Sequence, residues 1–459
     1  MVRLNDPLTQ VIILVSSGSY GLDAKDSDVG NKAGQTFSVV FAFSSLFAGA
    51  LFNAFGHRIL LVCGGLMYVL YIGSFLAYHH IQSMTFVYVA SVFLGLGAGW
   101  LWTAQGAIML GYPEEGDKGK YFSIFWGIFN LGAVIGNFIP VGLAWNDPDA
   151  SGASDGAYIA YMAIMVVGAF LSTLLLPASK IVRKDGTNVT VVKYSSPLFE
   201  IKSILGLFAD WRMLVLFPMF FASNWFYTYQ FTYNTLNFTV RTRSLNSAIY
   251  WLAQIIASVL FGAFLDRHQW SRPTRARYGL ILLTLILIAI WIGGIINQRT
   301  FGPRGYIIDP TTGTAVKNPA DYHMIDAATS AYAGPFFLYF FFGAADAMYQ
   351  GYSYWLMGAL TNDPSQAGRF AGFYKFAQNI GAVLAPLVQL STIGIAPKEG
   401  HNIMNATGRG MGEIIVCVVL VFVGIIGAIP VAFRAVKDHT VEDGDVNEKN
   451  ELEHHEEKV

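Results

Sequence analysis

The sequence predicts an all-α protein that crosses a membrane many times and is built from two repeats of six helices. Three observations support this fold class: the composition, the number of long apolar stretches, and short motifs that recur in both halves. Of the 459 residues, 54% are apolar and 13% are charged, whereas soluble domains carry about twice that charged fraction. A soluble fold of this length could not bury so much apolar surface, and a disordered chain would be poor in apolar residues.

Eleven stretches are long enough to cross a bilayer, which requires about 20 apolar residues per helix. They lie at residues 34–55, 59–79, 84–111, 121–145, 157–177, 212–232, 246–265, 278–296, 331–360, 370–392 and 411–434.

A further apolar segment lies before them, within residues 9–20. Its apolar core, from Val11 to Val15, is too short to span the hydrocarbon layer. We interpret it as a stunted first helix, which gives twelve helices in two groups of six.

This count divides the chain into four parts. They are an N-terminal six-helix bundle with a truncated first helix (1–177), a cytoplasmic linker with a possible interfacial helix (178–211), a C-terminal six-helix bundle (212–434) and an acidic disordered tail (435–459).

The distribution of basic residues predicts the orientation of these helices. If both termini are cytoplasmic, the cytoplasmic side holds 18 of the 29 Lys and Arg residues, as the positive-inside rule requires. Two glycosylation sequons, at Asn237 and Asn405, then lie on the outer side and are candidate modification sites. The choice between plasma membrane and endomembrane stays open.

Short motifs recur in the two halves in the same order. A Gly-x-x-x-Asn/Asp pattern followed by basic residues places Asn53 and Arg58 after the second helix, and Asp266 and Arg267 after the eighth. Two further pairs follow at matching helices: Gln105-Gly106 with Gln350-Gly351, and Asn130-Leu-Gly-Ala-Val with Asn379-Ile-Gly-Ala-Val. Repeats of this kind are typical of transporters that bind solute between two bundles near the middle of the membrane.

The first of these patterns resembles the loop motif of the major facilitator superfamily. In that superfamily the acid and the basic residues hold the cytoplasmic ends of the bundles together, so the resemblance implies gating roles for Asn53, Arg58, Asp266 and Arg267. The first copy departs from the motif, because Asn53 replaces the acid and Ala54 the first basic residue. A charge latch is therefore expected to depend more on the second copy.

A more specific resemblance is to the unc-ninety-three family, a divergent branch of that superfamily, and to its fungal members in particular. The strings that carry it include Leu101-Trp-Thr-Ala-Gln-Gly106, Phe125-Trp126, Asp346-Ala, Tyr354-Trp-Leu-Met-Gly358 and Tyr374-Lys375. Family members regulate a potassium channel or escort immune receptors, so the resemblance implies either a transporter or a regulator of another membrane protein. The chain departs from the family at its first helix, where about half a helix is missing.

Two charged residues lie inside the predicted spans, Asp346 in the tenth helix and Lys375 in the eleventh. Each costs about 2.5–3.5 kcal/mol to insert and therefore needs a partner or water. Asp346 could couple transport to protons or another cation, with Lys375 as its counter-charge. Alternatively, the two residues form a fixed salt bridge between their helices.

Polar and aromatic residues at helical spacing predict a shared central cavity between helices 4, 5, 10 and 11. Its candidate residues are Trp102, Gln105, Trp126, Asn130, Asp346, Gln350, Lys375 and Asn379. The alternative is that these Asn and Gln side chains bridge neighbouring helices. A third cluster in the seventh helix, which includes Trp225, Tyr227 and Tyr229, favours a position at the membrane interface. The alternative is that this cluster forms a wall of the substrate site.

The leading hypothesis is a transporter that moves a small solute by alternating access, with a proton or cation as the coupling ion. The alternative is a non-transporting protein that regulates a channel or escorts a membrane-protein client. The sequence contains no nucleotide loop, metal-ligand cluster or nucleophile–base motif, so we expect no enzyme activity and no cofactor. The net charge of −1 gives no support for a nucleic-acid partner. The expected partners are the lipid bilayer, an unknown solute and, under the alternative, the client.

Overall fold

The computed structural model describes residues 27–146, 155–176, 180–182, 189, 196–301, 306–308, 315–317, 325–393 and 406–439. Its long helices are α2 (Ser27–Ile81), α3 (Met84–Gly111), α4 (Lys118–Asn146), α5 (Asp155–Leu171), α9 (Val240–Leu265), α10 (Arg272–Phe301), α11 (Ala333–Leu360), α12 (Pro364–Ile393) and α13 (Ala406–Pro430). Three shorter helices are α6 (Pro197–Leu207), α7 (Trp211–Ala222) and α8 (Trp225–Asn237).

The observed helices overlap all eleven predicted spans. The element α2 includes the first two of them, and its backbone is interrupted between them at Gly56, with φ 75° and ψ 170°. This conformation is easily adopted only by glycine. A short 3₁₀ segment, Ser172–Leu174, extends α5, and a π-helical turn, Val431–Ala435, extends α13. The stunted helix within residues 9–20 and most of the acidic tail lie outside the described residues.

The predicted span at residues 212–232, the seventh helix when the stunted first helix is counted, is not one continuous helix. It is divided into α7 and α8 by a break at Ser223 and Asn224. Breaks of this kind inside a membrane leave backbone and side-chain polar groups facing the protein interior. The position of this break brings polar atoms next to the candidate site described below.

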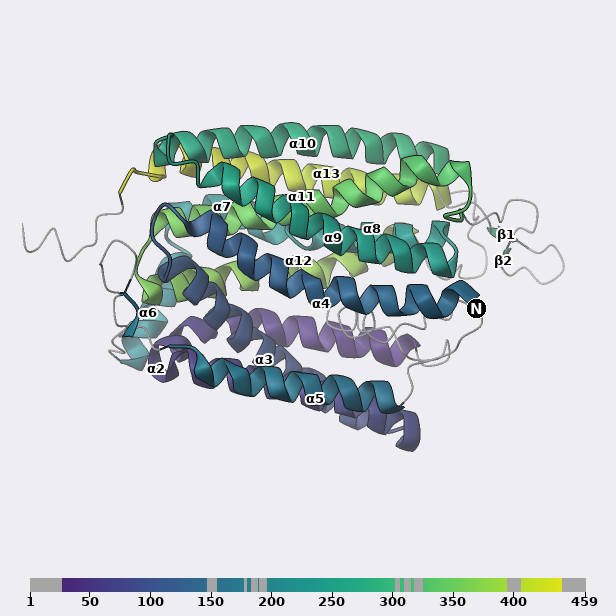
Figure 1. The fold of residues 1–459 in the computed structure, drawn as a ribbon, viewed down its shortest axis with the longest axis horizontal. Helices are drawn as coiled ribbons and strands as arrows, with labels where there is room; N and C mark the ends of the chain where they lie inside the picture. The colour runs from purple at the N-terminus through teal and green to yellow at the C-terminus, as the bar shows by residue number, and fades with distance from the viewer. Residues whose placement is uncertain are drawn as a thin grey trace, which may run out of the picture.

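The helices run along the length of the molecule, with α2, α3 and α5 together on one side and α10 and α13 on the other (Figure 1). Contacts between the two halves run mainly through α4 on α9 and through α12 on α2 and α3. The halves approach closely because glycine lies at the contact: a side chain at Gly49 would meet the backbone of Arg369 at 3.0 Å.

The two ends of the molecule differ (Figure 1). The linker helix α6 lies at one end, and a small antiparallel hairpin of β1 (Tyr306–Ile308) and β2 (Ala315–Lys317) lies at the other. Below, we call these the α6 end and the hairpin end. The presence of α6 agrees with the helix predicted in the linker, and several of its apolar side chains, including Leu198 and Leu205, are exposed.

The outer surface of the bundle is strongly apolar. Large side chains such as Ile128, Ile164 and Leu260 are each about two-thirds exposed, as expected for helices that face lipid. Among the described residues, five helices are long and apolar enough to cross a membrane, and a sixth candidate is the bent pair Pro197–Leu207 and Trp211–Asn234. The chain is therefore a multi-pass integral membrane protein.

Candidate functional site

The carboxylate of Asp346 is buried within the C-terminal half and is surrounded by hydrogen-bond donors. Asp346 lies in the middle of α11 and is 1% exposed. Its Oδ2 accepts a hydrogen bond from the hydroxyl of Tyr227 on α8 at 2.6 Å, and its Oδ1 accepts one from the amide of Gln350 at 2.7 Å. The hydroxyl of Tyr250 on α9 lies 3.2 Å from Oδ2. Three elements thus meet at one carboxylate.

The hydroxyl of Tyr250 has two acceptors within reach but only one proton. Gln230 Oε1 lies at 2.8 Å, and Asp346 Oδ2 lies slightly farther away. The ionised carboxylate can hold the Tyr250 proton. When the carboxyl is protonated, Tyr250 can donate its hydrogen bond to Gln230 and accept a hydrogen bond from the Asp346 carboxyl instead. This arrangement accommodates both protonation states of Asp346 without leaving a donor unpaired.

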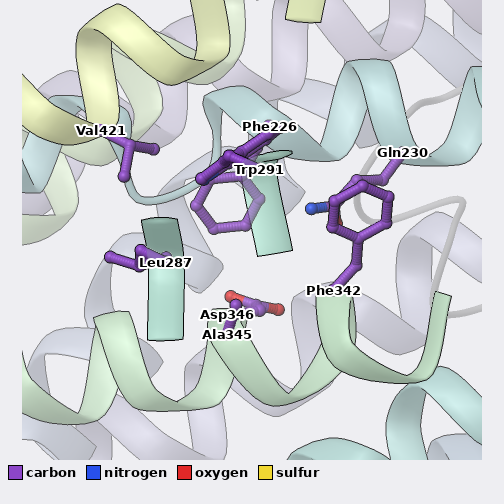
Figure 2. A pocket seen from close by; sticks show the side chains of 8 residues that line it. All are labelled: Phe226, Gln230, Leu287, Trp291, Phe342, Ala345, Asp346 and Val421. Atoms are coloured by element: carbon purple, nitrogen blue, oxygen red, sulfur yellow. The ribbon is translucent and has the colours of Figure 1, made fainter. Parts of the chain in front are cut away.

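A small cavity adjoins this carboxylate (Figure 2). It measures about 10 Å³, which is room for one water molecule. Figure 2 shows the Asp346 side chain on the α11 side of the cavity, with the rings of Phe226 and Trp291 across from it. The other lining residues are Gln230, Leu287, Phe342, Ala345 and Val421.

Two glutamine amides connect Asp346 with Lys375. The Gln350 amide nitrogen donates to Asp346, and its oxygen accepts from the Gln378 amide at 3.0 Å. The Gln378 oxygen in turn accepts from the Lys375 ammonium at 2.8 Å. The Gln378 amide nitrogen also lies within hydrogen-bond distance of Ser223 and Asn224, at the break between α7 and α8. Within the described part of the chain, Asp346 and Lys375 form no direct ion pair.

The ammonium of Lys375 lies against aromatic rings from both halves of the chain. Its Nζ is 4.3 Å from the ring centre of Trp102 on α3, and 5.2 and 5.9 Å from those of Tyr374 and Tyr354. Such contacts stabilise a buried cation by about 2 kcal/mol or more when water is excluded. Lys375 is 4% exposed, so these rings and Gln378 take the place of its hydration shell.

Trp102 belongs to an aromatic surface of the N-terminal half. Its ring packs edge-on against Phe129 at 5.0 Å and Phe125 at 6.2 Å, both on α4. Its indole nitrogen donates to the hydroxyl of Tyr68 at 3.2 Å. The Lys375 ammonium of the C-terminal half therefore faces an aromatic wall built by α3 and α4.

The structure places the other predicted site residues in three different situations. The Gln105 amide is buried and has no hydrogen-bond partner among the described residues. The Trp126 indole donates to Gln254 Oε1 on α9 at 2.8 Å. Asn130 and Asn379 each donate to a carbonyl oxygen four residues earlier, that of Trp126 and that of Lys375. The repeat-related asparagines thus make the same contact within their own helices.

At the α6 end, the second copy of the loop motif joins the two halves through Asp266. Its carboxylate accepts hydrogen bonds from the backbone nitrogens of Gly119 and Lys120 at 2.9 and 2.5 Å, in the first turn of α4. A carboxylate at this position also interacts favourably with the helix dipole. Burial raises the pKa of Asp266 to about 6, and these backbone hydrogen bonds oppose that shift. Arg267 instead lies over the ring of Trp270 and donates to Gln269.

In the first copy of the motif, the missing acid is supplied by the linker. The Asn53 amide donates to both carboxylate oxygens of Glu200 on α6, at 3.1 and 3.2 Å. Arg369 on α12 binds the same oxygens at 3.0 and 3.1 Å. Glu200 is 2% exposed, so a buried carboxylate joins α2, α6 and α12. The basic residue of the motif, Arg58, donates to the carbonyl of Leu175 and remains exposed.

Further contacts between the halves lie next to Asp266. The Lys118 ammonium donates to the backbone oxygens of Gly358 and Thr361 and to the side chain of Asn362. Arg272 pairs with Glu115 at 3.1 Å. The α6 end therefore holds the two halves together through buried polar groups.

Several residues of this site could not be selected from the sequence. Gln378 and Glu200 have no counterpart in the repeat motifs, and the helix 7 aromatics were expected at a membrane interface. That expectation is wrong for Tyr227 and Tyr229, because Tyr227 binds Asp346 and Tyr229 donates to Gln298 while 3% exposed. The available signal was the clustering of polar residues around the break in that helix.

The predicted glycosylation sites stay predictions. The Asn237 amide donates to the carbonyl of Tyr233 at 2.8 Å, and Asn405 lies outside the described residues.

Comparisons with known proteins identify similar chains along most of the sequence. Residues 33–386 match the family model described as Major Facilitator Superfamily. UNC93-like protein 1 of Arabidopsis thaliana is 40% identical over 396 residues, which covers 83% of this chain and 84% of the plant protein. UNC93-like protein C922.05c of Schizosaccharomyces pombe is 38% identical over 370 residues, covering 80% and 71%. A particular closeness to fungal members stays an expectation, because the plant and fission yeast proteins match about equally.

Solved structures of transporters share the fold. A variant of the E. coli fucose:proton symporter FucP superposes with a TM-score of 0.59 at 14% identity, covering 93% of this chain and 95% of that one. The proton:xylose symporter XylE, bound to a glucose derivative, gives a TM-score of 0.60 at 11% identity, covering 96% and 94%. At these identities the likeness concerns the fold alone.

Proposed function

Because this chain belongs to the major facilitator superfamily, a family of transporters, and within it to the UNC93-like proteins, we propose that it moves a small solute across a membrane by alternating access. In this proposal Asp346 takes up and releases the coupling proton, and Lys375 contacts the solute. The observation that carries the proposal is the chain of hydrogen bonds from Asp346 through Gln350 and Gln378 to Lys375.

The direction of these hydrogen bonds supports a coupling role. Both amides point their nitrogen towards the carboxylate and their oxygen towards the ammonium, the order that an ionised Asp346 and a charged Lys375 require. A protonated Asp346 can donate to the Gln350 oxygen, which allows both amides to turn over. The Gln378 nitrogen would then face the ammonium, and two donors repel each other. Protonation of Asp346 would thus release Lys375 from Gln378.

The surroundings of Lys375 indicate the kind of solute that fits. An ammonium has three N–H donors, and the acceptor described above, Gln378, uses one of them. The neighbouring wall contains Trp102 and the unpartnered amide of Gln105. A small solute with an anionic or hydrogen-bond-accepting group and an apolar face would complement this wall.

We further propose that the buried contacts at the α6 end close one side of the transport path. Glu200 of the linker binds groups from both halves, and Asp266 of the C-terminal half binds backbone groups of the N-terminal half. These bonds must break before the halves can separate there. The excess of basic residues in the linker supports a cytoplasmic location for this end.

The experiment that tests transport compares small-molecule profiles inside and outside cells that lack the gene, carry it, or carry Asp346→Asn. A solute whose distribution changes on deletion, and recovers only with the unmutated gene, supports transport. An unchanged profile would contradict it and favour the alternative, a regulator or escort. Stable co-purification of another membrane protein would then be the expected observation.

A further inference from the structure

Two adjacent histidines at the end of α2 converge on a carboxylate at the start of α5. His79 Nδ1 lies 3.3 Å from Asp155 Oδ1, and His80 Nε2 lies 2.8 Å from Asp155 Oδ2. The two imidazole rings are 5.3 Å apart. The three ligand atoms all lie within 4.8 Å of one another, although neighbouring residues on a helix normally point about 100° apart.

This cluster lies far from the contacts at the α6 end and shares no residue with the candidate solute site. Asn53, which binds α6, precedes Gly56, and His80 follows Gly56 by a helix of 24 residues. At about 1.5 Å per residue, that helix carries the histidines roughly 36 Å towards the hairpin end. All three side chains are accessible to solvent, with exposures of 64%, 56% and 43%.

The ligand set and the local electrostatics suit a divalent transition metal. Two imidazole nitrogens, one carboxylate oxygen and a water molecule form a common four-coordinate zinc site. The histidines occupy the last turn of α2, where the helix dipole favours positive charge. Asp155 occupies the first turn of α5, where it favours negative charge. A cation at this point interacts favourably with the C-terminal end of α2 and with the carboxylate of Asp155.

We propose that His79, His80 and Asp155 form a Zn²⁺ site that joins the ends of α2 and α5. Small rotations of the three side chains bring their ligand atoms to the zinc–ligand distances of about 2.0–2.2 Å. The bound ion links two helices of the same half, so it stiffens that half and leaves the contacts between halves unchanged. This proposal is independent of the transport proposal, because it uses none of the same residues.

The main alternative is a simple ion pair between protonated histidines and Asp155, which needs no metal. The two accounts are separated by titrating Zn²⁺ into the purified full-length chain, freed of metal with a chelator and prepared without a polyhistidine tag. The background carries His454→Asn and His455→Asn, since these adjacent tail histidines could also bind Zn²⁺. Binding is followed by calorimetry, and the melting temperature is followed with and without Zn²⁺.

We expect saturable binding of one Zn²⁺ per chain and a higher melting temperature with the ion. Asp155→Asn and His80→Asn should each weaken binding about tenfold or more, because each removes a ligand. His80→Cys, which replaces one zinc ligand with another, should retain saturable binding. His268→Asn is the matched control, because it removes another exposed histidine elsewhere, and it should bind Zn²⁺ like the background chain.

Two results would overturn the proposal. One is the absence of saturable Zn²⁺ binding in the background chain. The other is an affinity that Asp155→Asn and His80→Asn leave unchanged, or that His268→Asn weakens equally, because the ion would then be bound elsewhere.

Discussion

The carboxylate of Asp346 and the ammonium of Lys375 are joined through two glutamine amides, with no direct ion pair between them. A direct pair between α11 and α12 would cancel both charges and hold the helices together. The observed arrangement keeps the two charges apart but makes the hydrogen bonds of one depend on those of the other. It therefore disfavours the fixed salt bridge as the reason for two charges in the membrane.

The connection predicts that Gln378 matters for both stability and coupling. Gln378→Leu leaves the Lys375 ammonium without the acceptor described here, so we expect the free energy of unfolding to fall by about 1–3 kcal/mol. Gln378→Glu restores an acceptor and thus stability. Its carboxylate, however, holds Lys375 whether Asp346 is protonated or ionised. Thermal unfolding of the two variants should separate them, whereas solute flux should lose its pH dependence in both. A solute flux through Gln378→Glu that keeps its full pH dependence would contradict a coupling role for the hydrogen bonds between Asp346 and Lys375.

The aromatic wall predicts a graded response at Trp102. Trp102→Leu removes the ring below Lys375 and should lower the free energy of unfolding by about 2 kcal/mol, or more through lost packing. Trp102→Phe keeps an aromatic face and should recover part of that loss, although it also removes the donor to Tyr68. Melting temperatures of the two variants test this order. Equal melting temperatures would show that the cation–π contact contributes nothing measurable.

The linker contact predicts strong coupling between Asn53 and Glu200. Glu200→Gln leaves Arg369, whose side chain is 12% exposed, without its carboxylate partner, and we expect a loss of about 3–5 kcal/mol. Asn53→Asp places a second carboxylate against Glu200 and should also be destabilising. In the double variant one carboxylate and one amide are again paired, so its loss should be smaller than the sum of the two single losses. The measurement is the melting temperature of the unmutated chain, the two single variants and the double variant. Losses that simply add would argue against a direct coupling between Asn53 and Glu200.

Asp266 predicts a pH dependence of stability with a defined sign. Its pKa in the folded chain, about 6, lies above the ordinary value of 3.8, so the folded chain binds the proton more tightly. The contribution of Asp266 to stability is fully present below pH 4 and falls as the pH rises towards 6, by about 3 kcal/mol in total. Asp266→Asn should remove this slope from the unfolding free energy measured between pH 4 and pH 6.

A matched control for that slope is Asp326→Asn. A hydrogen bond from Arg241 holds the pKa of Asp326 well below its usual range, so this group titrates below pH 4 and loses its contribution only as the pH falls there. Asp326→Asn should leave the slope between pH 4 and pH 6 intact. If both variants behave alike, Asp266 is not the group responsible.

The positions of the helices could be predicted from the sequence because the bilayer dictates the length of an apolar helix. The span predicted at 84–111 coincides with α3, Met84–Gly111. The break at Ser223 and Asn224 was not predicted, because hydropathy averages over a window and neither residue interrupts the apolar run for long. Gly56 lies between the predicted spans at 34–55 and 59–79. Its positive φ is the local reason that α2 is interrupted there.

The candidate site could be predicted only in part. Asp346, Gln350 and Lys375 were identified because charged and amide side chains are rare inside membranes. The repeat pattern also selected Asn379, four residues after Lys375, whereas the ammonium binds Gln378, three residues after it. Both spacings lie on one helix face, so the sequence cannot choose between them. The partnership of Asn53 and Glu200 spans 147 residues and depends on how α6 packs against α2 and α12.

The most direct test of the central proposal is flux of the solute found by cell profiling, measured in vesicles containing the purified chain or its Asp346→Asn variant. The external pH is varied in both. If Asp346 carries the coupling proton, flux through the unmutated chain should follow the proton gradient, and the variant should lose that dependence while remaining folded. Equal, pH-dependent flux through both proteins would contradict the role of Asp346.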